Sequence, residues 1–136
     1  MLQPPTSILV VDDDRAIAQL LNDVLTDEGY TVRTCFTGIA AWELLQEHKP
    51  ALMITDLRME TDEAGFVLVQ RMRAVPRLES TPVILCAANH QFLTTHCDEL
   101  HQLNCETLEK PFDLGNLLAT VDSLVPCPLL QSADSR

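Results

Sequence analysis

Five short runs of apolar or strand-favouring residues, the fifth weaker than the others, alternate with longer segments in which apolar residues recur every three or four positions. A short continuous run is typical of a strand buried on both faces, and the longer spacing is typical of an amphipathic helix. The predicted strands are 8–11, 31–35, 51–55, 82–87 and 106–109. The predicted helices follow them, around 17–25, 40–48, 64–75, 91–103 and 114–124.

Residues that stop helices support these boundaries. Gly29 follows the first helical segment, and Pro50 and Pro76 follow the second and third. Glycine ends helices because it accepts a left-handed conformation, and proline cannot continue a helix. In the fourth helix the spacing predicts four inward-facing side chains, those of Phe92, Cys97, Leu100 and Leu103.

Strict alternation of strand and helix predicts an α/β fold. Parallel strands need crossover connections, and right-handed crossovers put helices on both faces of the sheet. We therefore expect a doubly wound, five-stranded parallel sheet flanked by five helices. In such sheets the functional crevice lies beyond the carboxyl ends of the strands.

The length of 136 residues suits one domain, which we expect at 7–125, with an extension at 1–6 and a tail at 126–136. The sequence has no apolar run long enough to span a membrane and no signal-peptide pattern, so a soluble, cytoplasmic protein is expected. The net charge of −11 argues against direct binding to nucleic acid. The five cysteines contain no CxxC pair, so we expect neither a disulfide framework nor a zinc site.

Charged residues stand directly after three of the predicted strands. Asp12 and Asp13 follow the first strand, Asp56 follows the third, and Lys110 follows the fifth. Carboxylates gathered in one crevice repel one another and raise each other's pKa values unless a cation lies among them. Mg²⁺ prefers such oxygen ligands, and a lysine opposite the ion can hold an anionic oxygen. The pattern predicts a Mg²⁺ site that accepts a phosphoryl group on Asp56.

Each of these residues also has a purely structural interpretation. Aspartates after a strand often cap the next helix, and we prefer that interpretation for Asp14. For Asp12 and Asp13 alone the two interpretations are evenly balanced, and Asp56 at a second strand end decides for the site. Without a GxxxxGK[ST] loop the chain is not expected to bind ATP, so its phosphoryl donor must be another molecule.

Four segments together resemble the motif set of response-regulator receiver domains, the CheY-like superfamily: VVDDD at 10–14, ITDLRM at 54–59, PVIL at 82–85 and KPF at 110–112. The resemblance covers roughly residues 6–125 and implies a flavodoxin-like sheet of order 2-1-3-4-5. It implies that Asp56 is the phosphoacceptor, and that Asp13, Asp56 and the backbone carbonyl of Arg58 ligate Mg²⁺. It also implies that Asp12 holds a metal-bound water, that Lys110 contacts the phosphoryl oxygens, and that the Lys110–Pro111 bond is cis.

The sequence departs from the family pattern at four positions. Glu60 replaces a proline, and Gly65 falls one residue later than usual, so that Glu60, Asp62 and Glu63 are expected at the mouth of the pocket. Ala87 replaces the threonine or serine of the switch, and Thr107 replaces its aromatic partner. The chemical step is therefore expected to be intact and the readout to be altered.

Three functions follow from these residues. The first is a phosphorylation switch that receives its phosphoryl group from a sensor histidine kinase or phosphotransfer protein. No enzymatic activity is expected beyond the transfer to Asp56 and slow autodephosphorylation. The second is an interaction module whose readout is phosphate-independent, which Ala87 and Thr107 favour. The third is an aspartyl-phosphate hydrolase. Such an enzyme usually has a DxD motif with its nucleophile on the first strand, whereas here the first loop reads DDD and Asp56 lies on the third strand. For the first, the resemblance implies a partner surface made of the fourth helix, fifth strand and fifth helix. No output domain is recognisable, so the chain either acts through partners or is a piece of a longer regulator.

Overall fold

The computed structural model describes residues 6–125 and alternates strands with helices along the chain. Its five strands are β1 (Ser7–Val11), β2 (Thr31–Cys35), β3 (Leu52–Asp56), β4 (Val83–Ala87) and β5 (Cys105–Glu109). Its helices are α1 (Arg15–Asp27), α2 (Gly38–Glu47), α3 (Ala64–Arg73), α4 (His90–Thr95), α5 (Cys97–Gln102) and α6 (Leu114–Leu124). Each predicted strand is confirmed to within a residue or two at its ends.

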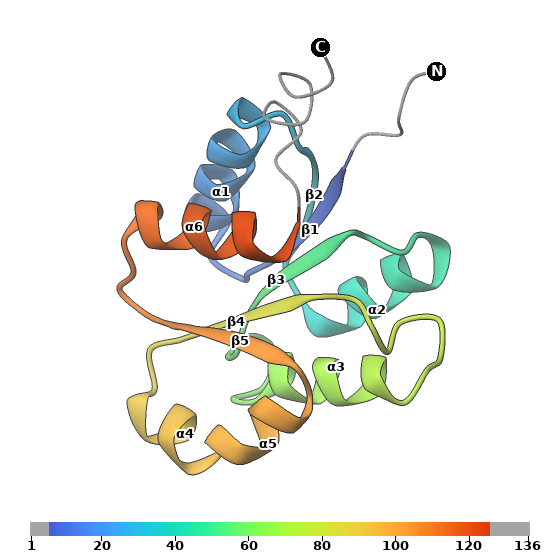
Figure 1. The fold of residues 1–136 in the computed structure, drawn as a ribbon, viewed down its shortest axis with the longest axis vertical. Coiled ribbons are helices and arrows are strands. Elements are labelled where there is room, and N and C mark those ends of the chain that lie inside the picture. Colours follow the sequence, from blue (N-terminus) through green and yellow to red (C-terminus); the bar gives the residue numbers. More distant parts are fainter. Residues whose placement is uncertain (1–5, 126–136) are drawn as a thin grey trace.

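All strand pairs are parallel, and the sheet order is β2-β1-β3-β4-β5. Helices α1 and α6 cover one face, and α2, α3, α4 and α5 cover the other (Figure 1). Successive strand residues point to opposite faces, so Ile8 and Val10 pack toward α1 and α6 while Leu9 and Val11 pack toward α2 and α3. The predicted doubly wound sheet and its strand order are confirmed.

The predicted fourth helix is interrupted, so the described chain has six helices instead of five. His96 separates α4 from α5, with φ −102° and ψ 16°. Its ring stacks on Phe92 at 4.0 Å between centroids, and its Nδ1 lies 3.1 Å from the Phe92 carbonyl oxygen. Cys97, the first residue of α5, is exposed, because it lies off the helical face that carries Phe92 and Leu100. The expectation that Cys97 faces inward was therefore wrong, whereas Phe92 and Leu100 are buried as predicted.

The predicted helix stop at Gly29 has a conformational reason. Gly29 has a φ of 97°, a left-handed value that favours glycine, and it follows Glu28, the C-cap residue of α1. The expected extension at 1–6 and tail at 126–136 lie outside the described residues, apart from residue 6. Within residues 6–125 no helix is both long and apolar enough to cross a membrane.

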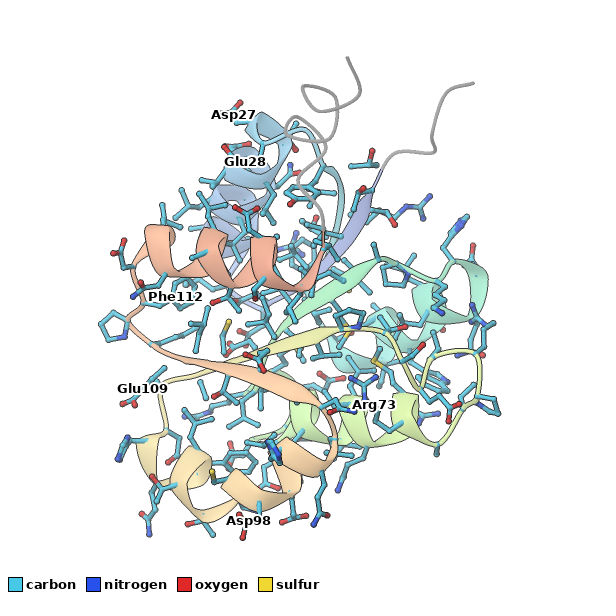
Figure 2. All side chains as sticks on the ribbon, in the orientation of Figure 1. Asp27, Glu28, Arg73, Asp98, Glu109 and Phe112 are labelled. Atoms are coloured by element: carbon cyan, nitrogen blue, oxygen red, sulfur yellow. The ribbon has the colours of Figure 1, made fainter. Side chains whose placement is uncertain are left out.

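Strand β5 forms one edge of the sheet, next to β4. Its side chains Glu106, Thr107 and Glu109 are exposed, and Figure 2 shows Glu109 on the outer side of the strand. His90, the first residue of α4, contacts Glu109 with a distance of 2.9 Å between Nδ1 and Oε1. The five-residue strand β5 therefore presents two exposed carboxylates, those of Glu106 and Glu109, at the edge of the sheet.

Arg73, at the end of α3, ties that helix to the segment between α5 and β5 (Figure 2). Its guanidinium donates to the carbonyl oxygens of Leu103 (2.6 Å), Leu78 (3.1 Å) and Asn104 (3.4 Å). We expect Arg73→Met to lower the free energy of unfolding by about 2 kcal/mol, because the carbonyls lose charge-assisted partners. Urea denaturation measures this loss. Arg33→Met, on an exposed position of β2, serves as the control and should change stability by less than about 0.5 kcal/mol.

Candidate functional site

Three strand ends bring charged side chains into contact at the carboxyl edge of the sheet. Asp12 directly follows β1, Asp56 ends β3, and Lys110 directly follows β5. The Lys110 ammonium nitrogen lies 3.3 Å from Oδ2 of Asp12 and 3.3 Å from Oδ2 of Asp56. These groups are well shielded, since the side-chain exposures are 19% for Lys110, 5% for Asp12 and 12% for Asp56. The Lys110–Pro111 peptide bond is cis, as predicted.

Asp13 completes a cluster of carboxylates. Asp12, Asp13 and Asp56 each offer an oxygen atom, and these oxygens lie within 4.8 Å of one another. Asp14 stays outside the cluster and caps α1, because its Oδ1 accepts hydrogen bonds from the N–H groups of Ala16 and Ile17. The structural interpretation of Asp14 is thus confirmed. Three hard oxygen donors facing one ammonium group fit a divalent cation such as Mg²⁺.

The electrostatics of the cluster favour such a cation. Burial and the neighbouring Asp12 carboxylate raise the pKa of Asp56, although Lys110 and the Leu57 N–H oppose the increase. Burial lowers the pKa of Lys110, but Asp56 and Asp12 outweigh it and the net pKa is raised. Lys110 therefore carries its charge at neutral pH, and the carboxylates still outnumber it. For Asp56 the direction of the pKa shift agrees with the expectation, with burial as its largest cause and the Asp12 carboxylate second.

A cavity of about 460 Å³ opens over Asp56. Its wall includes Asp13 and Lys110, the β3–α3 loop residues Arg58, Met59, Asp62 and Glu63, and residues from the end of β4 and from α4, namely Ala87, Ala88, Asn89 and Phe92. The guanidinium of Arg58 lies 3.3 Å from Asp62 on the exposed rim. The volume is ample for a phosphoryl group and hydrated ion beside Asp56.

The two altered positions occupy different environments. Ala87 is 1% exposed and contributes only a methyl group to the cavity wall. Thr107 is exposed on the edge strand β5. Beyond Ala87 the chain supplies Asn89, whose Oδ1 accepts the Phe92 N–H at 2.9 Å and caps α4. The sequence reasoning gave Asn89 and Phe92 no role in the cavity, although an asparagine just before a helix is a recognisable cap.

Glu60 does not lie where the sequence led us to expect it. Asp62 and Glu63 line the cavity as predicted, but Glu60 is not among the described residues that do. Its carboxylate instead accepts hydrogen bonds from the N–H groups of Gly38 (2.8 Å) and Ile39 (3.0 Å) at the start of α2. Burial raises the pKa of Glu60, yet these donors outweigh it and hold the pKa below its usual value. The unpaired N–H groups of the helix N-terminus attract the carboxylate away from the cavity.

Gly65 lies where the β3–α3 loop passes against the backbone of Asp56. A Cβ atom on Gly65 would lie 2.1 Å from the Asp56 carbonyl oxygen and 3.0 Å from Cα of Leu57. The Gly65 N–H also donates to the Leu57 carbonyl oxygen at 2.8 Å. The loop therefore closes directly against the backbone of Asp56 and requires a residue without a side chain.

Solved structures share this fold and its strand order. A response regulator receiver protein from Pseudomonas putida superposes with a TM-score of 0.80 and 29% identity, covering 90% of this chain and 99% of that one. The chemotaxis response regulator CheY4 of Vibrio cholerae gives a TM-score of 0.79 and 26% identity, covering 90% and 100%. These likenesses cover almost the whole of both solved chains.

A family model described as the response regulator receiver domain matches residues 8–122. The chain therefore belongs to the receiver domain family of two-component signalling, whose members are signalling modules rather than classical enzymes.

Curated relatives are longer than this chain. Response regulator Rre1 of Synechocystis sp. is 33% identical over 123 residues, which cover 89% of this chain and 52% of the relative. The DNA-binding transcriptional regulator NtrC of Bradyrhizobium sp. is 38% identical over 119 residues, which cover 87% of this chain and 24% of the relative. The chain thus spans about half or less of the length of these relatives.

Proposed function

We propose that the chain accepts a phosphoryl group on Asp56 in a Mg²⁺-dependent reaction, with a histidine kinase or phosphotransfer protein as donor. The observation that carries this proposal is the position of the Lys110 ammonium, 3.3 Å from both Asp12 and Asp56 beneath an open cavity. An Asp56 oxygen forms the new P–O bond while the P–N bond of the donor's phosphohistidine breaks, and the donor ring keeps the electron pair. A cytoplasmic location belongs to the same proposal.

Each residue of the cluster has a role in this reaction. Asp13, Asp56 and the backbone carbonyl of Arg58 would hold Mg²⁺, and Asp12 would hold a water bound to the ion. When bound, the ion neutralises the charge on the phosphoryl oxygens. Lys110 stabilises an oxygen on the other side of the group and keeps its charge because Asp56 and Asp12 raise its pKa. Slow autodephosphorylation then resets the site.

A downstream protein is the proposed reader of the phosphorylated state. We infer that it contacts the surface formed by α4, α5, β5 and α6, which lie next to one another along one side of the molecule (Figure 1). The charge of −11 makes nucleic acid an unfavourable direct partner for this chain by itself.

Intact-mass measurement tests the phosphorylation proposal. Incubation with Mg²⁺ and a small phosphodonor should add one phosphoryl group to the wild type and none to Asp56→Asn, and chelation of Mg²⁺ should abolish the adduct. Asp122→Asn, an exposed acid on α6, makes the same charge change away from the site and should keep the adduct. An adduct that survives Asp56→Asn would contradict the proposal.

The second candidate, an interaction module with phosphate-independent readout, is favoured by one observation. Ala87 gives the cavity wall no hydroxyl with which β4 could hold a phosphoryl oxygen. The mass measurement separates the two candidates, because a phosphate-independent module need not form an adduct. An unmodified wild type would support the second candidate.

A further inference from the structure

The N-terminus of α2 is held by a residue from a distant part of the chain. The first two N–H groups of the helix, those of Gly38 and Ile39, donate to the two carboxylate oxygens of Glu60. The third, that of Ala40, donates to the hydroxyl of the cap residue Thr37 at 3.0 Å. Local sequence therefore caps one amide, and the β3–α3 loop caps the other two. Such groups would otherwise be left to water.

The same loop forms one wall of the cavity over Asp56. Glu60 stands two residues after Arg58 and four after Asp56. The loop is short and closed, because Met59 N–H donates to the Thr61 carbonyl at 3.0 Å and Gly65 N–H donates to the Leu57 carbonyl at 2.8 Å. Met59 is also 9% exposed and packs in the core. Because these contacts restrict the loop, a displacement of the backbone at Arg58 also displaces the carboxylate of Glu60.

Strands β4 and β5 offer a weaker connection between the cavity and the rest of the molecule. The wall from β4 offers the methyl group of Ala87, which makes no hydrogen bond to a ligand. The edge position Thr107 is exposed to solvent. Asn89 on the cavity wall caps α4, whereas the β3–α3 loop connects the cavity to α2 through the hydrogen bonds of Glu60.

We propose that Glu60 is a positioning residue that couples occupancy of the Asp56 site to the N-terminus of α2. Binding of Mg²⁺ at the cluster orders the β3–α3 loop and tightens the contact of Glu60 with α2. By thermodynamic reciprocity, the contact with α2 in turn strengthens Mg²⁺ binding. The inference rests on the proposed Mg²⁺-dependent function of this site.

The surface that changes is the groove between α2 and α3. Its lining includes Gly38, Ile39 and Glu60 from the contact itself and Val67 from α3. Ile39 is 68% exposed and Val67 48%, which makes them two of the most exposed large apolar side chains in the described chain. A shift of the α2 N-terminus therefore alters an apolar surface shared by α2 and α3.

The chain contains its own reporter for this coupling. Trp42 is the single tryptophan of the sequence and lies on α2, with the Arg71 guanidinium carbon 4.1 Å from the centre of its ring. Addition of Mg²⁺ to the full chain should change Trp42 emission and slow hydrogen–deuterium exchange at residues 38–40 at least twofold. A phosphodonor added with Mg²⁺ should enlarge both changes.

Variants of Glu60 test whether the contact carries the signal. Glu60→Ala should abolish the Mg²⁺-dependent change in exchange and weaken Mg²⁺ binding three- to tenfold, and Glu60→Gln, which keeps one acceptor oxygen, should give an intermediate result. Thr37→Ala removes the helix's own cap and should raise basal exchange but keep the Mg²⁺ response. Glu47→Gln removes the same charge from an exposed position at the other end of α2, outside the cavity lining, and should also keep the response at residues 38–40.

The results separate this inference from the proposed function. A Mg²⁺ response at residues 38–40 that persists in Glu60→Ala would overturn the coupling. So would a wild type that binds Mg²⁺ and forms the Asp56 adduct while exchange at residues 38–40 and Trp42 emission stay constant. Failure of the adduct alone would count against phosphorylation, whereas the Mg²⁺ titration would still decide the coupling.

Discussion

Gly65→Ala is expected to lower the free energy of unfolding by about 3 kcal/mol or more, which is large for the addition of one methyl group. The new Cβ would meet the Asp56 carbonyl oxygen at 2.1 Å, a backbone atom that no side-chain rotation can move aside. The Gly65 amide is also bonded to the Leu57 carbonyl, so helix α3 cannot retreat without breaking that bond. The affected backbone belongs to the candidate phosphoacceptor, and the adduct yield should fall as well.

Gly115→Ala is the matched control for this prediction. Gly65 and Gly115 are both the second residue of a helix, α3 and α6 respectively. At Gly115 the nearest atom to an added Cβ is a side-chain oxygen of Asp113 at 3.5 Å, an ordinary contact. Alanine there should be neutral or stabilise the protein by up to about 1 kcal/mol, because it is the better helix former. Equal stability changes for the two variants in urea denaturation would show that the close approach at Gly65 is unimportant.

Lys110→Met is expected to destabilise the metal-free protein by about 2 kcal/mol at neutral pH, because it leaves two shielded carboxylates without their cation. The loss of stability caused by Lys110→Met should increase as the pH rises. In the wild type the raised pKa of Asp56 means that the folded state binds more protons than the unfolded one, so stability falls as pH rises above the ordinary value of 3.8. Removal of Lys110 takes away an interaction that lowers this pKa, and the fall extends to higher pH.

Lys110 contributes in the same pH direction, but in a much higher pH range. Its folded-state pKa is raised above 10.5, so its stabilisation is present at all lower pH values and is lost only as pH rises through the folded pKa. Thermal melts of the wild type and Lys110→Met at several pH values should therefore diverge between acidic and neutral pH. Curves that stay parallel across this range would contradict the assigned ion pairs.

Two further measurements isolate the carboxylates. Asp56→Asn should stabilise the metal-free protein by about 1 kcal/mol at neutral pH, because it removes one of two repelling charges. In the Asp56→Asn background, Lys110→Met should cost less than it does alone, since Asp12 is the remaining close partner. Millimolar Mg²⁺ should restore much of the stability of Lys110→Met and should stabilise Asp56→Asn less.

The strand ends made the candidate site predictable from the sequence. Predicted strands end directly before Asp12, Asp56 and Lys110, and a parallel sheet brings the carboxyl ends of its strands to one edge. The direction of each chain segment was therefore enough to predict that these side chains converge. The 3.3 Å contacts of Lys110 confirm the convergence, whereas the catalytic roles of the residues stay predictions.

Features that depend on tertiary contacts were not predictable in this way. The hydrogen bonds of Glu60 reach residues 21 and 22 positions earlier, and local sequence says nothing of the free amides there. The helix also breaks at His96, whose ring packs against Phe92 and Phe66, and an apolar periodicity of 3.6 records neither the break nor these contacts. The exposure of Cys97 is a separate error, because a residue five positions after Phe92 lies off the buried face of a helix.

The acids on β5 bear on how copies of this chain meet one another. An exposed edge strand offers unpaired backbone groups to a second copy, and continuous sheets across two molecules form in this way. Joining two β5 edges would bring together four carboxylates, those of Glu106 and Glu109 from each copy. Their mutual repulsion opposes such a merger at neutral pH, so self-association through this edge is disfavoured and β5 remains open to partners that carry positive charge.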